Sequence, residues 1–134
     1  DVTCICPHHL LPASGVLHIG YVPGGKVVGL GALHRLAECF SRRLILQETL
    51  CESVAAALVE HADAKGAACV ADLAPACLTA RGKRPAHARV VTFGTAGSLA
   101  TDAALRREFL VLCRSEHSHA ASPAHSLAHE GQAP

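Results

Sequence analysis

The pattern of apolar and polar positions in the first half of the chain predicts one strand followed by two helices. Residues 15–22 alternate well enough for a half-buried strand, and the turn residues Pro23-Gly24-Gly25 end it. Apolar side chains then recur at helical spacing over residues 32–40 and, as a longer stripe, over residues 46–61. Gly66 is a natural stop after the second helix.

The second half of the chain predicts two more strands and a last helix. We expect strands at residues 67–73 and 89–93, joined by a loop over residues 81–87. Thr101-Asp102 can cap a helix over residues 103–114, whose apolar residues share one face. This order of strand, two helices, two strands and helix predicts an α+β domain with an antiparallel sheet.

The chain divides by composition into a folded part and a tail. Residues 1–115 carry every periodic segment, whereas residues 116–134 are small, polar and rich in histidine, with Pro123 among them. Such a segment has too little apolar surface to fold by itself, so we predict a disordered tail. Its histidines could also bind a metal ion adventitiously.

Composition limits the kind of core and the kind of partner. Half of the 134 residues are hydrophobic but only 3% are aromatic, so we expect one domain whose core consists of small side chains and gains stability from oligomerisation. A net charge of +1 argues against nucleic acid and against a basic membrane-binding surface. Without a long apolar run or a signal-type N-terminus, the chain is expected to be cytoplasmic.

The seven cysteines are expected to be thiols or metal ligands, because disulfides are rare in a reducing cytosol. Four of them lie in apolar patterns and are predicted to fill the core, namely Cys39, Cys51, Cys69 and Cys113.

Three other residues can form a zinc site with an open position. Cys6 and His9 form a C-x-x-H motif, and Cys77 lies far downstream. Structural zinc usually has four protein ligands, whereas three leave a place where water can ionise near neutral pH. The spacing alone is equally typical of a core thiol beside a surface imidazole.

Four ordered blocks resemble the successive signatures of GTP cyclohydrolase I, and the match runs from about residue 4 to residue 114. The blocks are CPHHLLP at 6–12, YVPGGKVVGL at 21–30, FSRRL at 40–44 with Gln47-Glu48, and Cys77 with Arg81-Gly82. The resemblance implies the tunnelling fold, an antiparallel sheet with two helices packed on one face plus a C-terminal helix. It also implies a homo-oligomeric ring, such as a decamer, with the active site between subunits.

The resemblance further implies a role for each candidate residue. Gln47 and Glu48 would bind the substrate, with the Glu48 carboxylate accepting hydrogen bonds from N1 and the 2-amino group of guanine. Without the resemblance, Glu48 is better explained as an ordinary exposed glutamate in a helix's first turn, where the helix dipole favours it. The other implied roles are zinc binding by Cys6, His9 and Cys77, triphosphate binding by Arg35 and Arg81, and proton movement by His8.

The implied reaction is hydrolytic opening of the guanine imidazole ring of GTP, which gives formate and 7,8-dihydroneopterin triphosphate for the pterin and folate pathway. This chain departs from the family at three places. Pro75 stands where the family usually carries the proton-donating histidine, Gly31-Ala32 replaces a Ser-Lys pair, and Pro7 replaces a glutamate. General acid catalysis contributes about 10² to 10⁴ in rate, so the loss at position 75 bears directly on turnover.

Two alternatives therefore stay open beside the zinc-dependent hydrolase. One is a non-catalytic zinc-containing paralogue that binds a purine or a pterin. The other is a structural zinc domain in which His8 or Cys4 supplies a fourth ligand. The family's N-terminal helical segment also has no counterpart here, so we expect either a fragment or a shortened paralogue.

Overall fold

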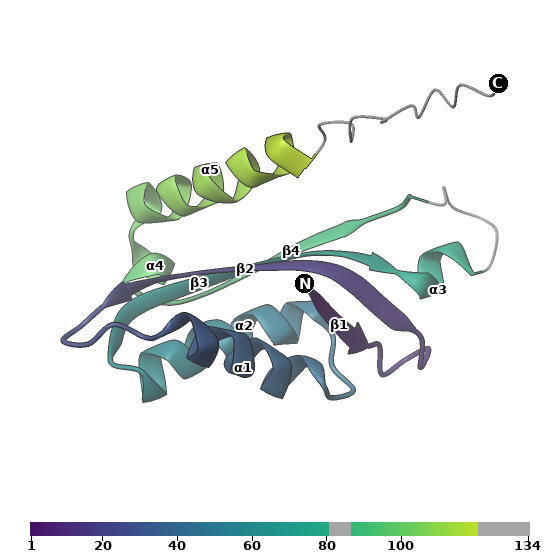
Figure 1. Ribbon diagram of the computed structural model, residues 1–134, viewed down its shortest axis with the longest axis horizontal. Coiled ribbons are helices and arrows are strands. Elements are labelled where there is room, and N and C mark those ends of the chain that lie inside the picture. Colours follow the sequence, from purple (N-terminus) through teal and green to yellow (C-terminus); the bar gives the residue numbers. More distant parts are fainter. Residues whose placement is uncertain (81–86, 121–134) are drawn as a thin grey trace, which may run out of the picture.

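The computed structural model describes residues 1–80 and 87–120, with side chains described up to residue 114. Its four strands form one antiparallel sheet in the order β1-β2-β3-β4. Helices α1 and α2 cover one face of this sheet and α5 lies on the other side (Figure 1). The elements are β1 (Val2–Ile5), β2 (Pro12–Pro23), α1 (Leu30–Ser41), α2 (Gln47–His61), β3 (Ala64–Pro75), α3 (Ala76–Thr79), β4 (Val90–Gly97), α4 (Ser98–Thr101) and α5 (Ala103–Ala120).

The α+β class and the antiparallel sheet with two helices on one face are confirmed. The sequence pattern did not predict β1, because its four residues are too short to show a period. The prediction of Gly66 as a helix stop is wrong. Helix α2 ends at His61, Asp63 turns the chain with a φ of 53°, and Gly66 lies inside β3.

The predicted tail is only partly described. Helix α5 continues to Ala120, and residues 121–134 lie outside the described residues, as does most of the predicted loop, residues 81–86. The division into a domain of residues 1–115 and a tail stays a prediction. Among the helices of residues 1–80 and 87–120, none is long and apolar enough to cross a membrane.

The core lies between α2 and the sheet and consists of small and medium side chains. Leu50, Val54 and Leu58 of α2 are buried against β3, where Cys69 and Leu73 point to the same side. The sheet and the helix can approach closely because their facing residues are short. This is the core of small side chains that the composition predicts.

Gly94 of β4 sets the height of α2 above the sheet. A Cβ atom built at Gly94 would stand 2.5 Å from the carbonyl carbon of Cys51 and 2.5 Å from the backbone nitrogen of Glu52. Backbone atoms cannot rotate away as a side-chain tip can, so a glycine is required for this contact. The second turn of α2 therefore lies close to the sheet.

Three of the four cysteines that were predicted to fill the core are buried, and the prediction for Cys39 is wrong. Cys39 is exposed on α1, where Arg43 donates to its sulfur at 3.5 Å. A hydrogen bond with Cys69 lowers the pKa of Cys51, and the same contact together with burial raises the pKa of Cys69. Cys113 is the third buried thiol.

Candidate functional site

A cavity of about 180 Å³ forms where β1, the end of β3 and the first turn of α2 meet. It brings together segments that are far apart in the sequence. Its lining includes Cys4, Cys6, Gln47, Glu48, Pro75 and Cys77.

Strand register explains how β1 and β3 form one wall of this cavity. Cys4 of β1 pairs with Ala13 of β2, and Ala13 pairs with Pro75 of β3. Paired residues of an antiparallel sheet point to the same face, so Cys4 and Pro75 lie in one row with a small alanine between them. Strand β3 ends at Pro75 and α3 begins at once, which brings Cys77 to the cavity.

A tight turn after β1 brings Cys6 and His9 together. The backbone N–H of Cys6 donates to the carbonyl of Leu11 at 3.0 Å, and the N–H of Leu10 donates to the carbonyl of Cys6 at 2.9 Å. Sγ of Cys6 and Nδ1 of His9 are 3.6 Å apart. Zinc bonds of about 2.3 Å to sulfur and about 2.0–2.1 Å to nitrogen, at a tetrahedral angle, place the two atoms about 3.6 Å apart.

The third predicted ligand is near but not assembled with the first two. Cys77 and Cys6 line the same cavity, whereas His9 is exposed and lies outside the lining. Within residues 1–80 and 87–114, no three His, Cys, Asp or Glu side chains stand close enough together to hold a metal ion. The donor set fits zinc in its chemistry and in the Cys6 to His9 spacing, and zinc binding by all three residues stays a prediction.

Two further groups differ in their exposure. His8 is exposed and lies edge-on to His9, with ring centroids 6.2 Å apart, and it does not line the cavity. The Cys4 thiol is only 2% exposed. Burial raises the pKa of Cys4, and the charge of Cys6 raises it further.

The two residues at the start of α2 have different surroundings. Gln47 is 8% exposed, and its side-chain nitrogen donates to the carbonyls of Ala71 and Val90 at 2.9 and 2.8 Å. Glu48 is exposed at the rim of the cavity. The carboxylate is therefore available to a ligand, while the neighbouring amide nitrogen is used by the sheet.

Of the two predicted triphosphate-binding arginines, Arg35 is the one that the structure describes. Arg35 is exposed on α1 and does not line it. A Cβ atom built at Gly31 would lie 3.4 Å from Nη1 of Arg35, so the guanidinium lies beside the position where the family usually has a larger residue. Arg81 lies outside the described residues.

Arg89 and Asp72 form an ion pair that the motifs of the sequence do not predict. Nε of Arg89 donates to Oδ1 of Asp72 at 2.6 Å, and Nη2 donates to the carbonyl of the same residue at 2.7 Å. The sequence feature that could have predicted this pair is Asp72, an acidic residue within an apolar strand, because a buried carboxylate requires a partner. The pair ties β3 to the start of β4.

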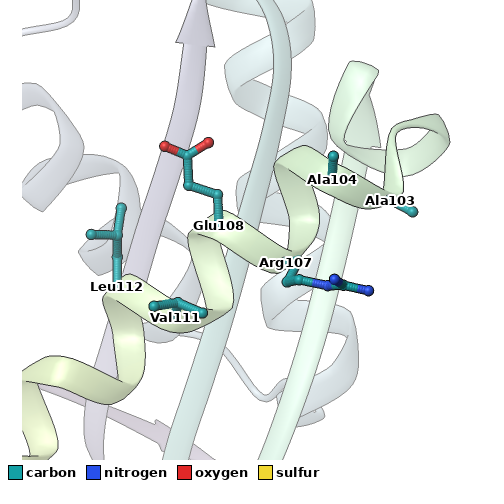
Figure 2. Close-up of a pocket in the computed structure, with 6 residues that line it drawn as sticks. All are labelled: Ala103, Ala104, Arg107, Glu108, Val111 and Leu112. Atoms are coloured by element: carbon teal, nitrogen blue, oxygen red, sulfur yellow. The ribbon is translucent and has the colours of Figure 1, made fainter.

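A larger hollow of about 460 Å³ lies along α5 (Figure 2). All its lining residues come from this one helix, with Arg107 and Glu108 as the charged members. Helix α5 is on the side of the sheet opposite α1 and α2 (Figure 1). The hollow therefore shares no wall with the cavity that contains the predicted ligands.

Comparison with known proteins places the chain in a family. The family model described as GTP cyclohydrolase I matches residues 1–114. A GTP cyclohydrolase 1 of Chromobacterium violaceum is 42% identical over 106 residues, which is 79% of this chain and 52% of that protein. The corresponding protein of Campylobacter lari is 42% identical over 111 residues, 83% of this chain and 58% of its own length.

A third relative gives the same result. The GTP cyclohydrolase 1 of Dictyostelium discoideum is 39% identical over 115 residues, which is 86% of this chain and 50% of that protein. The chain thus spans about half the length of the curated relatives it matches. These matches, with which the antiparallel sheet agrees, show that the chain belongs to the GTP cyclohydrolase I family.

Proposed function

We propose that this chain is a zinc-dependent hydrolase of the GTP cyclohydrolase I type, which opens the imidazole ring of GTP to give formate and 7,8-dihydroneopterin triphosphate. One observation carries this proposal. Cys6, Cys77 and Glu48, which are far apart in sequence, line one cavity in a chain that matches the family over residues 1–114. Metal ligation and purine binding are thus available side by side.

In the proposed site, zinc is held by Cys6, His9 and Cys77. The chemistry that zinc supplies with three protein ligands is the activation of water as a nucleophile near neutral pH. The 3.6 Å separation of the Cys6 sulfur and the His9 Nδ1 supports two of the three ligands. Cys77, which lines the same cavity as Cys6, would supply the third ligand.

Glu48 orients the base. Its carboxylate is exposed at the cavity rim and can accept hydrogen bonds from both N1–H and the 2-amino group of guanine. Adenine presents no such pair of donors on that edge, so the same carboxylate gives selectivity for guanine. Guanine C8 then faces the end of the cavity with Cys6 and Cys77.

The proposed triphosphate site requires more than one chain. Arg35 and Arg81 supply guanidinium groups suited to phosphate oxygens, and Arg35 lies on α1 outside the cavity of its own chain. We therefore propose a homo-oligomeric ring with the active site at the subunit interface. Val27 lies just before α1, and Leu30 is the first residue of α1. They are 80% and 84% exposed and would be covered in such an assembly.

The residue at position 75 of the proposed site does not supply a proton donor. Pro75 lines the cavity and cannot donate a proton, so His8 is the proposed donor, although it lies outside the lining. Slow turnover is the expected result. The presence of Pro75 in the cavity wall also favours a second candidate function, which is non-catalytic binding of a purine or pterin.

One experiment separates the two functions. The zinc-loaded protein is incubated with GTP, formate and oxidised fluorescent pterin are measured, and the binding of GTP and of a pterin is followed by calorimetry. Both products together support the hydrolase, whereas binding without either product supports the second function. Absence of both binding and products refutes both.

Two glutamates of α2 provide a matched pair of variants. Glu48→Gln should weaken GTP binding, because the amide replaces one acceptor oxygen with a donor. Glu52→Gln makes the same chemical change one turn later, at an exposed position outside the cavity lining, and should leave binding unchanged. Equal affinities of the two variants would exclude Glu48 as the purine anchor.

A further inference from the structure

Gln47 is a buried polar residue at the first position of α2. The residue before it, Leu46, is the helix N-cap and forms no side-chain capping hydrogen bond. The first turn of α2 therefore lacks the usual side-chain anchor of a helix start. The side chain of Gln47 instead turns away from the helix and into the sheet.

The side-chain amide of Gln47 joins α2 to two strands at once. Its nitrogen donates to the carbonyl of Ala71 on β3 at 2.9 Å and to the carbonyl of Val90 on β4 at 2.8 Å. A carboxamide nitrogen carries two hydrogens, so both are used by these two acceptors. The nitrogen has no further hydrogen to donate to a bound purine.

These hydrogen bonds lie where the β3–β4 ladder ends. Val90 is the first residue of β4, and its pairing with Leu73 is the last one of the ladder, beyond which β3 continues to Pro75 paired with β2 only. The carbonyl of Gln47 itself accepts a longer hydrogen bond of 3.4 Å from Thr92 Oγ1. The start of α2 is thus held to both strands at the edge of the cavity.

The position of Glu48 depends on this connection. Glu48 follows Gln47 in the same helical turn and is exposed at the cavity rim, and within residues 1–80 and 87–114 no hydrogen bond or ion pair fixes its side chain against the sheet. A shift of about 1 Å in a positioning group can reduce the rate about 10²-fold, so the anchorage of this turn matters for a ligand.

We propose that Gln47 is a positioning residue, which holds the first turn of α2 against β3 and β4 so that the Glu48 carboxylate faces the wall formed by Cys6 and Cys77. Gln47 acts through Glu48 and does not donate from its amide nitrogen to the purine. This inference rests on the proposed function, because it assumes that Glu48 binds guanine.

The chain offers a direct test of the hydrogen bonds without any substitution at position 47. It contains no asparagine, and its two glutamines are Gln47 and Gln132. Nuclear magnetic resonance of the ¹⁵N-labelled chain therefore shows only two side-chain NH₂ pairs, and a Gln132→Ala variant assigns them. The NH₂ hydrogens of Gln47 should exchange with solvent at least tenfold more slowly than those of a free glutamine. Exchange at the free rate would overturn the proposal.

A double-mutant cycle tests whether Gln47 acts through Glu48. Gln47→Met keeps the length of the side chain and removes both donors. It should weaken GTP binding, measured by calorimetry, about tenfold when Glu48 is present and less than about twofold in a Glu48→Gln background. Equal losses in both backgrounds would show that Gln47 does not act through Glu48.

The control for a loss of stability is Val54→Ala. Val54 is fully buried on the same helix and does not line the cavity, so its truncation should lower stability but leave the Kd for GTP unchanged. A parent protein that fails to bind GTP refutes the proposed function and this positioning role together. A parent that binds GTP, with equal losses in the cycle, refutes only the positioning role.

Discussion

Replacement of Pro75 by histidine should restore the missing proton donor. Pro75 has φ −73° and ψ 120°, which is an extended conformation that histidine adopts without strain. The residue paired with it across the ladder is Ala13, whose methyl group leaves room for an imidazole on the cavity side. The new side chain would enter the cavity between the walls that carry Cys6 and Cys77.

The expected size of the effect has two parts. A general acid contributes about 10² to 10⁴ in rate, so kcat of Pro75→His should rise by that factor while KM changes little. Loss of the proline raises the entropy of the unfolded chain and should lower the free energy of unfolding by about 0.4–1 kcal/mol. A more active enzyme should thus be slightly less stable.

The assay measures initial rates of pterin formation by fluorescence after oxidation, over a range of GTP concentrations. Pro75→Ala is the matched control, since it removes the proline and adds no imidazole. An equal gain in both variants would assign the effect to the backbone. No gain over an active parent would refute the reasoning, because another group must then already supply the proton.

Three further predictions concern the position of α2 and the metal ligands. Gly94→Ala should lower the free energy of unfolding, measured in urea, by about 1–3 kcal/mol, because there is no room for the alanine methyl group. Gly29→Ala is the control and should change this free energy by less than about 0.5 kcal/mol, because no atom lies within 4 Å of a Cβ built at Gly29. Similar changes in the two would contradict the close contact. Cys77→Ser should reduce the zinc retained after dialysis, measured by plasma mass spectrometry, and full retention would remove Cys77 from the ligand set. Cys4→Ser should leave the thiolate absorption of the Co²⁺-loaded protein unchanged if the site has two sulfur ligands, and a loss of intensity would show that Cys4 closes the site instead.

Periodicity predicted the long elements, because a buried face repeats over many residues. The helix expected over residues 46–61 is found as α2, Gln47–His61, and the strand expected over residues 15–22 lies within β2. Positions that depend on one contact were less predictable. Gly66 was expected to end a helix, yet it lies in β3, where a Cβ atom would stand 2.3 Å from Ser98 Oγ.

The candidate site was predictable in its membership more than in its geometry. The blocks around Cys6, Gln47-Glu48 and Cys77 gave residues that the fold brings to one cavity. The role of Gln47 could not be predicted from them, because its acceptors are backbone carbonyls of Ala71 and Val90, and any residue type provides a carbonyl. Only the strand register decides which carbonyls lie within reach.

Position 75 shows how binding and turnover can separate in one cavity. The backbone there is extended, so proline and histidine fit the fold equally well, and the choice between them falls on the chemistry alone. The wall proposed to bind the purine is different, because Gln47 is tied to two strands and Gly94 leaves no room for a side chain beneath α2. A change in that wall would reduce stability as well as binding. Loss of the proton donor at the end of β3 lowers neither stability nor binding. Substitutions at this position should therefore abolish GTP hydrolysis more readily than GTP binding.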